Sequence, residues 1–303
     1  MLRKLNMLNV SIIIMIFLLI IITISGLLSF DVSKSYNFTN IYGDSIKIFG
    51  NGVYKYDSYF KAPIFIGTDF IMLVVVVPLL IISLYKNIKQ RTIKTKLALV
   101  SIIGVIVYYA TSISFGVTYN ELHLLYIALF SISLFDMFIL ISDINKKDLR
   151  DKQKLNLPTK GITIFLILAG ASLFFAWLPD IITSLVSNKS LALIENYTTE
   201  ITYVIDMGVI SPLAIICLYY LKKKNGVGDI IFTILLKACI IIGIILLSQS
   251  IFQIIAGIDI PIPALITKIG VFILFSVFAI YFNNKYYKNI EKRNWTTTRR
   301  YGK

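Results

Sequence analysis

The chain contains few charged residues and very little histidine or cysteine. Only 15% of its 303 residues are Asp, Glu, Lys or Arg, whereas 57% are hydrophobic. In a soluble domain about a quarter of the residues are charged. One histidine, His123, and two isolated cysteines, Cys217 and Cys239, exclude zinc sites of the usual spacing. No metal or other cofactor is therefore expected, and the composition excludes a single water-soluble core.

Motifs of common enzymes are also missing from the sequence. It has no H-E-x-x-H, G-x-S-x-G or P-loop pattern. An enzyme is therefore the less favoured class, although a membrane enzyme that works with Asp, Glu, Tyr and one His is left open. The formal net charge of +14 is explained by Lys and Arg in loops beside apolar runs. Nucleic acid is therefore not an expected partner.

Eight long apolar runs are the main feature that is present. A transmembrane helix needs about 20 apolar residues, and each run provides this length. The sequence predicts an all-α, polytopic helical bundle in which residues 1–303 form one integral membrane domain within a lipid bilayer. The spans are expected near 9–28, 64–85, 97–115, 121–142, 161–180, 200–221, 229–256 and 264–283.

Lys and Arg collect on one side of the predicted spans. The N-terminus, the loops after spans two, four and six, and the tail 284–303 hold most of the 30 basic residues. Cytoplasmic loops are enriched in Lys and Arg, so both termini are expected in the cytoplasm. Richness in Ile, Lys and Asn is typical of bacteria with AT-rich genomes, which predicts the bacterial inner membrane. The basic tail is expected to bind anionic lipid.

The longest loop on the opposite side covers residues 29–63. Residues 46–49 and 53–56 alternate around Gly50-Asn51-Gly52, a pattern typical of a β-hairpin. The sequence predicts a small extracytoplasmic hairpin with these two strands. An isolated hairpin is marginally stable in water, so it is expected to lie on the helix ends or on lipid headgroups.

Two segments repeat at a spacing of 134 residues. Pro78–Tyr85 reads PLLIISLY and Pro212–Tyr219 reads PLAIICLY, and each ends a predicted span before a Lys-rich loop. Four spans separate the two copies, so both would have the same orientation. The repeat indicates a parallel 4+4 duplication of halves 1–142 and 161–283. Chance similarity in Ile- and Leu-rich sequence is the alternative.

Acidic groups within the spans are the candidate site. A charge in the bilayer costs at least about 2.5–3.5 kcal/mol, so it faces protein or water. Asp69, Glu200, Tyr203 and Asp206 lie in the outer half and are predicted to bind a substrate or ion in an outward-facing polar cavity. Tyr203 precedes Asp206 by three residues on one helix face. The alternatives are that Asp69 and Glu200 only favour helix N-termini and that Asp206 only fixes packing.

Two further sets of polar residues are singled out. Asp136 and Lys237 lie at matching depth in the inner half, and we predict that they form an ion pair. Glu121, His123 and Lys268 form an outer polar cluster near the membrane interface. One histidine cannot make a metal site, so no metal is predicted there.

Parts of spans two to six are similar to an uncharacterised group of bacterial multi-pass membrane proteins. The resemblance implies the eight-helix topology, but it implies no activity and no site residue. The similar segments are Gly67-Thr68-Asp69, Phe115–Asn120, Leu124–Ser131, Thr198-Thr199-Glu200 and Asp206-Met207-Gly208.

Three function classes follow from these patterns. The leading hypothesis is transport or binding of a small solute or ion through the outer polar cavity, with Lys237 as an inner counter-charge. The first alternative is a membrane-embedded enzyme acting on lipid or a lipid-linked group through Glu121 and His123. The second is a non-catalytic subunit or sensor that uses the hairpin and the basic tail. The sequence names no substrate, oligomeric state or protein partner.

Overall fold

The computed structural model describes residues 7–259 and 269–290, and these are mostly helical. Seven helical segments among them are long and apolar enough to cross a membrane. They support the predicted membrane class, and each overlaps one of the first seven predicted spans. The segments are α1 (Met7–Leu28), Ala62–Gln90, α4 (Ile93–Gly116), α5 (His123–Asp143), α7 (Lys160–Ser187), Ile201–Lys222 and α10 (Gly226–Ile255).

The eighth predicted span is not confirmed. Its first residues, 264–268, lie outside the described residues, and its remainder falls in α12 (Gly270–Lys288). This helix is not among the seven apolar segments. Polar residues in its last two turns, Asn283, Asn284 and Lys285, lower its apolar character.

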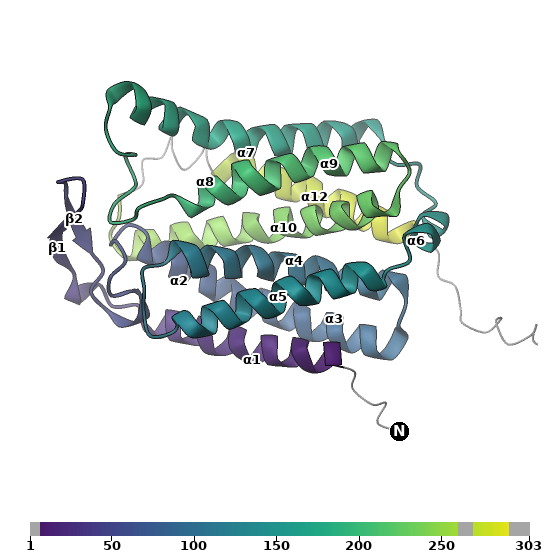
Figure 1. Cartoon of the computed structure of the whole chain (residues 1–303), viewed down its shortest axis with the longest axis horizontal. Coiled ribbons are helices and arrows are strands. Elements are labelled where there is room, and N and C mark those ends of the chain that lie inside the picture. The colour runs from purple at the N-terminus through teal and green to yellow at the C-terminus, as the bar shows by residue number, and fades with distance from the viewer. Residues whose placement is uncertain (1–6, 260–268, 291–303) are drawn as a thin grey trace, which may run out of the picture.

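The helices lie side by side along the long axis of the molecule (Figure 1). Of the seven segments, α4 is the most enclosed. In its apolar stretch 67% of the residues are buried, whereas in that of α7 only 22% are buried. α4 packs against α5 and against α10, and α10 packs in turn against α12. α4 and α10 therefore form the centre of the bundle, where one large apolar core fills the space between the helices.

Two of the segments are interrupted by a π-helical turn. The first consists of α2 (Ala62–Ile71), η3 (Met72–Val76) and α3 (Val77–Gln90). The second consists of α8 (Ile201–Ile205), η4 (Asp206–Ile210) and α9 (Ser211–Lys222). A proline, Pro78 or Pro212, is the second residue after each wide turn. Because a proline ring clashes with the carbonyl four residues before it, a wide turn at this place relieves the clash.

A two-stranded antiparallel sheet, β1 (Tyr36–Thr39) and β2 (Ser45–Ile48), lies at one end of the bundle (Figure 1). We call this the hairpin end, and the opposite end, which carries α6 (Lys146–Lys152), the α6 end. The turn is closed by Asn40, whose side-chain oxygen accepts hydrogen bonds from the backbone N–H groups of Tyr42 and Asp44 (3.0 and 2.8 Å). A small sheet is therefore confirmed.

The predicted position of the second strand is wrong. Residues 52–54 form a short 3₁₀ helix, η2 (Gly52–Tyr54), rather than a strand. The backbone N–H of Val53 donates to Ser29 Oγ (2.9 Å), and a Cβ at Gly52 would fall 2.1 Å from the same oxygen. The chain therefore packs against the end of α1 and does not pair with residues 46–49, which overlap β2.

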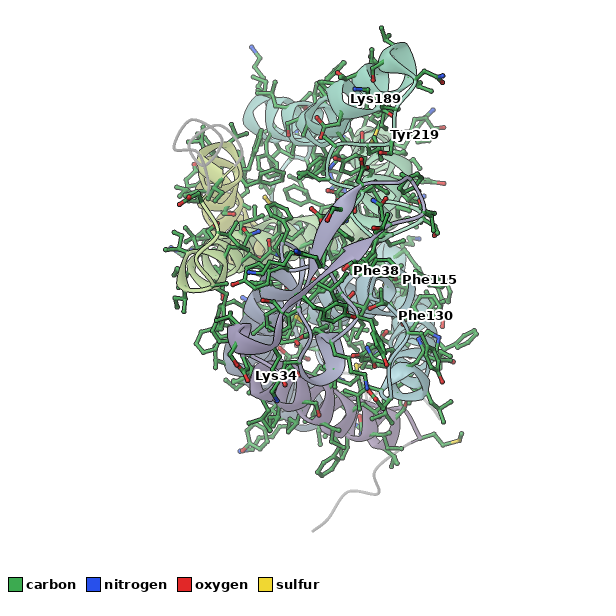
Figure 2. All side chains as sticks on the ribbon, turned by 90° about the vertical axis from the view of Figure 1, so that its left-hand side faces the viewer. Lys34, Phe38, Phe115, Phe130, Lys189 and Tyr219 are labelled. Carbon is green, nitrogen blue, oxygen red and sulfur yellow. The ribbon has the colours of Figure 1, made fainter. Side chains whose placement is uncertain are left out.

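Two loops join at the hairpin end, and we call residues 36–61 and 188–200 together the cap. Figure 2 looks onto this end, where the β1–β2 ribbon, with Phe38 on it, lies across the ends of the helices. Hydrogen bonds between residues 140 to 155 positions apart hold the two loops together. They join Asn40 Nδ2 to Glu195 O (2.7 Å), Tyr42 Oη to Tyr197 O (3.3 Å) and Asn196 Nδ2 to Tyr56 O (2.7 Å).

Candidate functional site

Asp69 is a fully buried carboxyl on α2. It accepts a hydrogen bond from Tyr54 Oη (2.6 Å) and one from Tyr109 Oη (2.5 Å). Gly26 on α1 makes room for this group, because a Cβ there would lie 1.7 Å from the Asp69 carboxylate. Tyr54 belongs to the cap and Tyr109 to α4, so the Asp69 site connects the hairpin end to the centre of the bundle.

Asp206 is the first residue of η4 and has 4% of its surface exposed. Its two carboxylate oxygens accept hydrogen bonds from Tyr108 Oη (3.1 Å) and from the indole Nε1 of Trp177 (3.0 Å). Asp206 is therefore held between α4 and α7, in the same manner in which Asp69 is held between the cap and α4.

The two carboxyls are linked through consecutive residues of α4. Tyr108 and Tyr109 point about 100° apart around the helix axis, so Asp206 and Asp69 lie on neighbouring sides of α4. Among the described residues, neither carboxyl forms an ion pair. Burial of a charge without a cation is expensive, whereas a neutral carboxyl retains hydrogen-bonding capacity at low cost. This arrangement suits groups that bind and release a proton.

Glu200 lies apart from both aspartates, at the hairpin end. It is the N-cap residue of α8 and forms an ion pair with Lys61, the N-cap residue of α2. The two side chains are only 12% and 13% exposed, and the Lys61 ammonium lies 4.3 Å from the centre of the Tyr197 ring. Desolvation lowers the pKa of Lys61 to about 8. The pair therefore joins the first residues of the two interrupted segments that carry Asp69 and Asp206.

Tyr203 does not contact Asp206 through its hydroxyl group. Its Oη donates to Asp180 on α7 (2.7 Å), and its ring stacks on Trp177 with centroids 4.7 Å apart. Tyr203 and Asp206 are therefore linked through Trp177 and not by a direct hydrogen bond. Trp177 contacts both residues and brings two acids and two aromatic rings together between α7 and α8.

The structure does not pair Asp136 with Lys237. No ion pair between them occurs among the described residues, and Asp136 Oδ2 is buried without a hydrogen-bond partner there. Asp136 lies on α5 and Lys237 on α10, and α4 packs against both helices. The prediction used depth alone, and equal depth does not place two helices side by side.

Glu121 and His123 of the predicted outer polar cluster have separate partners. Glu121 is exposed and forms an ion pair with Lys55, and a hydrogen bond from Lys55 lowers the pKa of Glu121. His123 instead lies between the rings of Tyr119 and Tyr126, with centroid distances of 5.4 and 6.5 Å. Lys268 lies outside the described residues. Nothing in this arrangement resembles an acid–base pair.

A buried acid at the α6 end was missed by the sequence analysis. Asp229 is fully buried, lies 3.6 Å from the Arg150 guanidinium and accepts a hydrogen bond from Tyr286 Oη (3.1 Å). It ends the pattern Gly226-Val227-Gly228-Asp229, and its carboxylate faces a cation.

The glycines of this pattern have a packing role. A Cβ at Gly226 would lie 2.3 Å from Lys146 O, and one at Gly228 would lie 2.6 Å from Leu221 N. Two backbone segments therefore approach the start of α10 closely, and the Arg150–Asp229 pair fixes α6 beneath it.

Asp57 is a second missed acid, in the cap. It is fully buried, and one oxygen accepts from the Thr118 backbone N–H (2.9 Å) and from Tyr197 Oη (2.8 Å). The other oxygen, Oδ2, has no hydrogen-bond partner among the described residues. Desolvation raises the pKa of Asp57 to about 7. The hydrogen bonds from Thr118 and Tyr197 and the charge of Lys61 lower this pKa, but their effect is smaller.

No protein-family model, curated protein or solved structure matches this chain. The resemblance to a bacterial multi-pass group therefore stays a prediction, and the function must be argued from the site. Within residues 7–259 and 269–290, no group of three or more His, Cys, Asp or Glu is placed to hold a metal ion.

Proposed function

We propose that the protein is a transporter of a small solute or ion in which Asp69 and Asp206 bind and release protons. The observation that supports this is the pair of buried carboxyls, each held by uncharged donors and joined through Tyr108 and Tyr109. An ionisable group at membrane depth is costly and is retained mainly where it acts. π-helical turns are frequent at functional sites, and one lies beside each carboxyl.

The same proposal includes eight spans with both termini in the cytoplasm of a bacterial cell. The α6 end holds the Lys-rich loops after spans two, four and six, which supports a cytoplasmic position for this end. α12 packs along α10 and would provide the eighth span together with the residues before it. The hairpin end would then face the outside.

A parallel 4+4 duplication explains several features together. The π-helical turns begin at Met72 and Asp206, exactly 134 residues apart, the spacing of the repeated Pro segments. The packing is also repeated: α1 contacts α3 and α5 as α7 contacts α9 and α12. α4 packs on α3 and α5, and α10 packs on α9 and α12. An axis along the membrane normal between α4 and α10 would relate the halves.

Access to the carboxyls requires movement of the cap. Asp69 and Asp206 are closed to water in this conformation, with 0% and 4% of their surfaces exposed. The Lys61–Glu200 pair lies about 12 Å outward of Asp69 and about 9 Å outward of Asp206 along their helices. Separation of this pair would open a path from the hairpin end to both acids, as transport by alternating access requires.

A non-catalytic subunit or sensor is the second candidate. All four residues of β1 are exposed, including Tyr36 and Phe38 at 46% and 50%. An exposed aromatic edge strand is a ready surface for pairing with another chain. Replacement of Phe38 by Ser tests this candidate, because co-purification with a partner would be lost while proton flux is kept.

Proton flux into proteoliposomes tests the transport proposal. Vesicles loaded with a pH-sensitive dye and given a potassium diffusion potential should acidify when they contain the wild-type protein. Asp206→Asn and Asp69→Asn should each abolish this flux, because an amide cannot carry the proton. Asp143→Asn, which alters an exposed acid paired with Lys96, should leave the flux unchanged. Equal flux in all four proteins would refute the proposal.

A further inference from the structure

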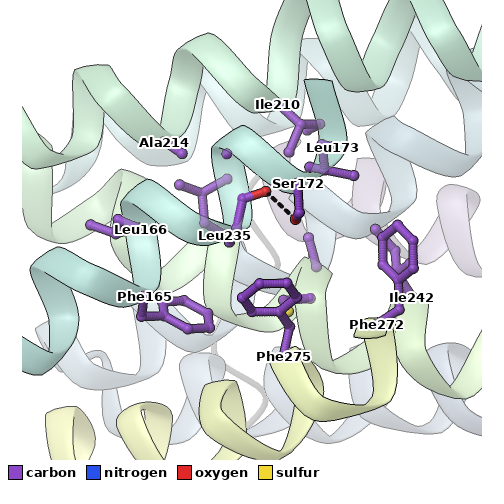
Figure 3. Close-up of a pocket in the computed structure, with 14 residues that line it drawn as sticks. Phe165, Leu166, Ser172, Leu173, Ile210, Ala214, Leu235, Ile242, Phe272 and Phe275 are labelled. Atoms are coloured by element: carbon purple, nitrogen blue, oxygen red, sulfur yellow. Dashed lines mark hydrogen bonds between the residues drawn. The ribbon is translucent and has the colours of Figure 1, made fainter. Parts of the chain in front are cut away.

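An apolar pocket lies between α7, α9, α10 and α12 (Figure 3). It is partly open to the outside, and hydrocarbon side chains form almost all of its wall. The hydroxyl of Ser172, one of the few polar groups there, already donates to Ala169 O (3.0 Å). The pocket therefore accepts a hydrocarbon group and offers nothing to a polar one.

The pocket lies directly below the polar cluster around Asp206. Its lining residue Ile210 follows Asp206 by one helical turn, and its lining residue Leu173 precedes Trp177 by one turn. Residues four apart share a helix face, about 6 Å from each other along the axis. The Asp206–Trp177 hydrogen bond therefore lies one helical turn beyond the wall of the apolar space, on the side of the hairpin end. We call the cluster of Asp206, Trp177, Asp180 and Tyr203 the ceiling of the pocket, although none of the four residues lines it.

The ceiling contains two carboxyl groups. Asp180 and Asp206 are both within it, held by Tyr203 and Trp177, and neither forms an ion pair among the described residues. The stacked rings of Trp177 and Tyr203 add two π-faces beside the acids, and aromatic faces attract cations. Two carboxyls and two rings above an apolar space have the chemistry that recognises an organic cation with a hydrocarbon body.

We propose that this pocket and its ceiling bind a cationic amphiphile, with the cation at Asp206 and Asp180 and the hydrocarbon part between Phe165, Ala214 and Phe275. This inference rests on the proposed function, since it names the class of solute that Asp206 would recognise. Lipid chains are as apolar as the pocket, so the apolar wall alone gives little preference over the bilayer. The two acids therefore select for a cation, and the pocket limits the shape of its hydrocarbon part.

Equilibrium binding of radiolabelled tetraphenylphosphonium to the protein in lipid nanodiscs tests this inference without any transport. Saturable binding is expected for the wild type. Asp206→Asn should weaken it about 10-fold or more, as expected for loss of a charged partner. Ala169→Leu should weaken it similarly by filling the pocket, whereas Ala171→Leu, about 200° away around α7, should not. Dodecylamine should compete, and dodecanol of equal chain length should not.

Three results would overturn the inference: no saturable binding to the wild type, equal affinity in Ala169→Leu and Ala171→Leu, or equal competition by dodecanol. Because Ala169→Leu keeps every polar contact, it remains informative if Asp206→Asn fails to fold. The outcome also separates the two proposals. Proton flux that is lost in Asp206→Asn, together with absent cation binding, would keep the transporter and reject this class of solute.

Discussion

Tyr108 and Tyr109 are neighbours in sequence and donate hydrogen bonds to two different buried carboxyls, Asp206 and Asp69. One helix, α4, thus holds both acids through adjacent residues. This relationship connects the segment that carries Asp69 with the segment that carries Asp206.

Removing either hydroxyl should affect its own carboxyl only. Tyr109→Phe leaves Asp69 with one donor, and a typical intramolecular hydrogen bond contributes about 0.5–1.5 kcal/mol. Tyr108→Phe should cost less, because its bond to Asp206 is longer (3.1 against 2.5 Å). Thermal unfolding in detergent measures both. A larger loss in Tyr108→Phe would contradict this order.

Breaking the Lys61–Glu200 pair should loosen the cap. Glu200→Gln removes one charge of a nearly buried pair, so backbone hydrogen exchange in residues 188–200 should accelerate. Glu121→Gln is the matched control, because its pair with Lys55 is well exposed, at 65% for the Glu121 side chain, and exposed pairs contribute about 0–1 kcal/mol. Equal acceleration in both variants would remove the gating role of Lys61 and Glu200.

Asp57 should make the stability of the protein depend on pH. Its pKa in the folded protein is about 7, above its ordinary value of 3.8. Between these values the unfolded chain is ionised while the folded protein keeps the proton, so the free energy of unfolding falls as pH rises from about 4 to about 7 and levels off above. The fall amounts to a few kcal/mol, since one pKa unit is about 1.4 kcal/mol.

Asp57→Asn should flatten this dependence, because an amide does not titrate. Melting temperatures of both proteins in detergent, measured in a series of buffers across this range, provide the comparison. A slope that persists unchanged in the variant would mean that another group causes it.

The ion pair at the α6 end should be structurally important. Arg150→Ala leaves the buried charge of Asp229 without its cation, which costs about 3–5 kcal/mol. The double variant Arg150→Met with Asp229→Leu should recover much of this loss, because both charges are then absent. Lys152→Ala, which removes the partly exposed pair with Asp148, should cost at most about 1 kcal/mol. Unfolding temperatures distinguish these outcomes.

The membrane fold was largely predictable from the sequence, because each apolar run of about 20 residues has one stable solution in lipid, a helix. The predicted limits of α1 and α10 agree with the structure within three residues. α7 continues to Ser187, well past the predicted end at 180, because Pro179 is accommodated within the helix. Hydropathy does not predict that a helix continues past a proline.

The site was only partly predictable. Asp69 and Asp206 were identified because charges among apolar residues are costly. Their partners Tyr54, Tyr108, Tyr109 and Trp177 were not, because the contacts join segments from 15 to 98 residues apart. The pairing of Asp136 with Lys237 failed for the same reason: depth can be read from a sequence, but the lateral order of helices cannot.

Proton exchange at Asp69 and Asp206 is measured most directly by infrared difference spectroscopy of the protein in nanodiscs, recorded between acidic and alkaline buffer. The carbonyl band of neutral carboxylic acids should lose one component in Asp69→Asn and a different one in Asp206→Asn, and it should be unchanged in Asp143→Asn. Spectra of the first two variants that match the wild type would contradict the role of these carboxyls in carrying protons.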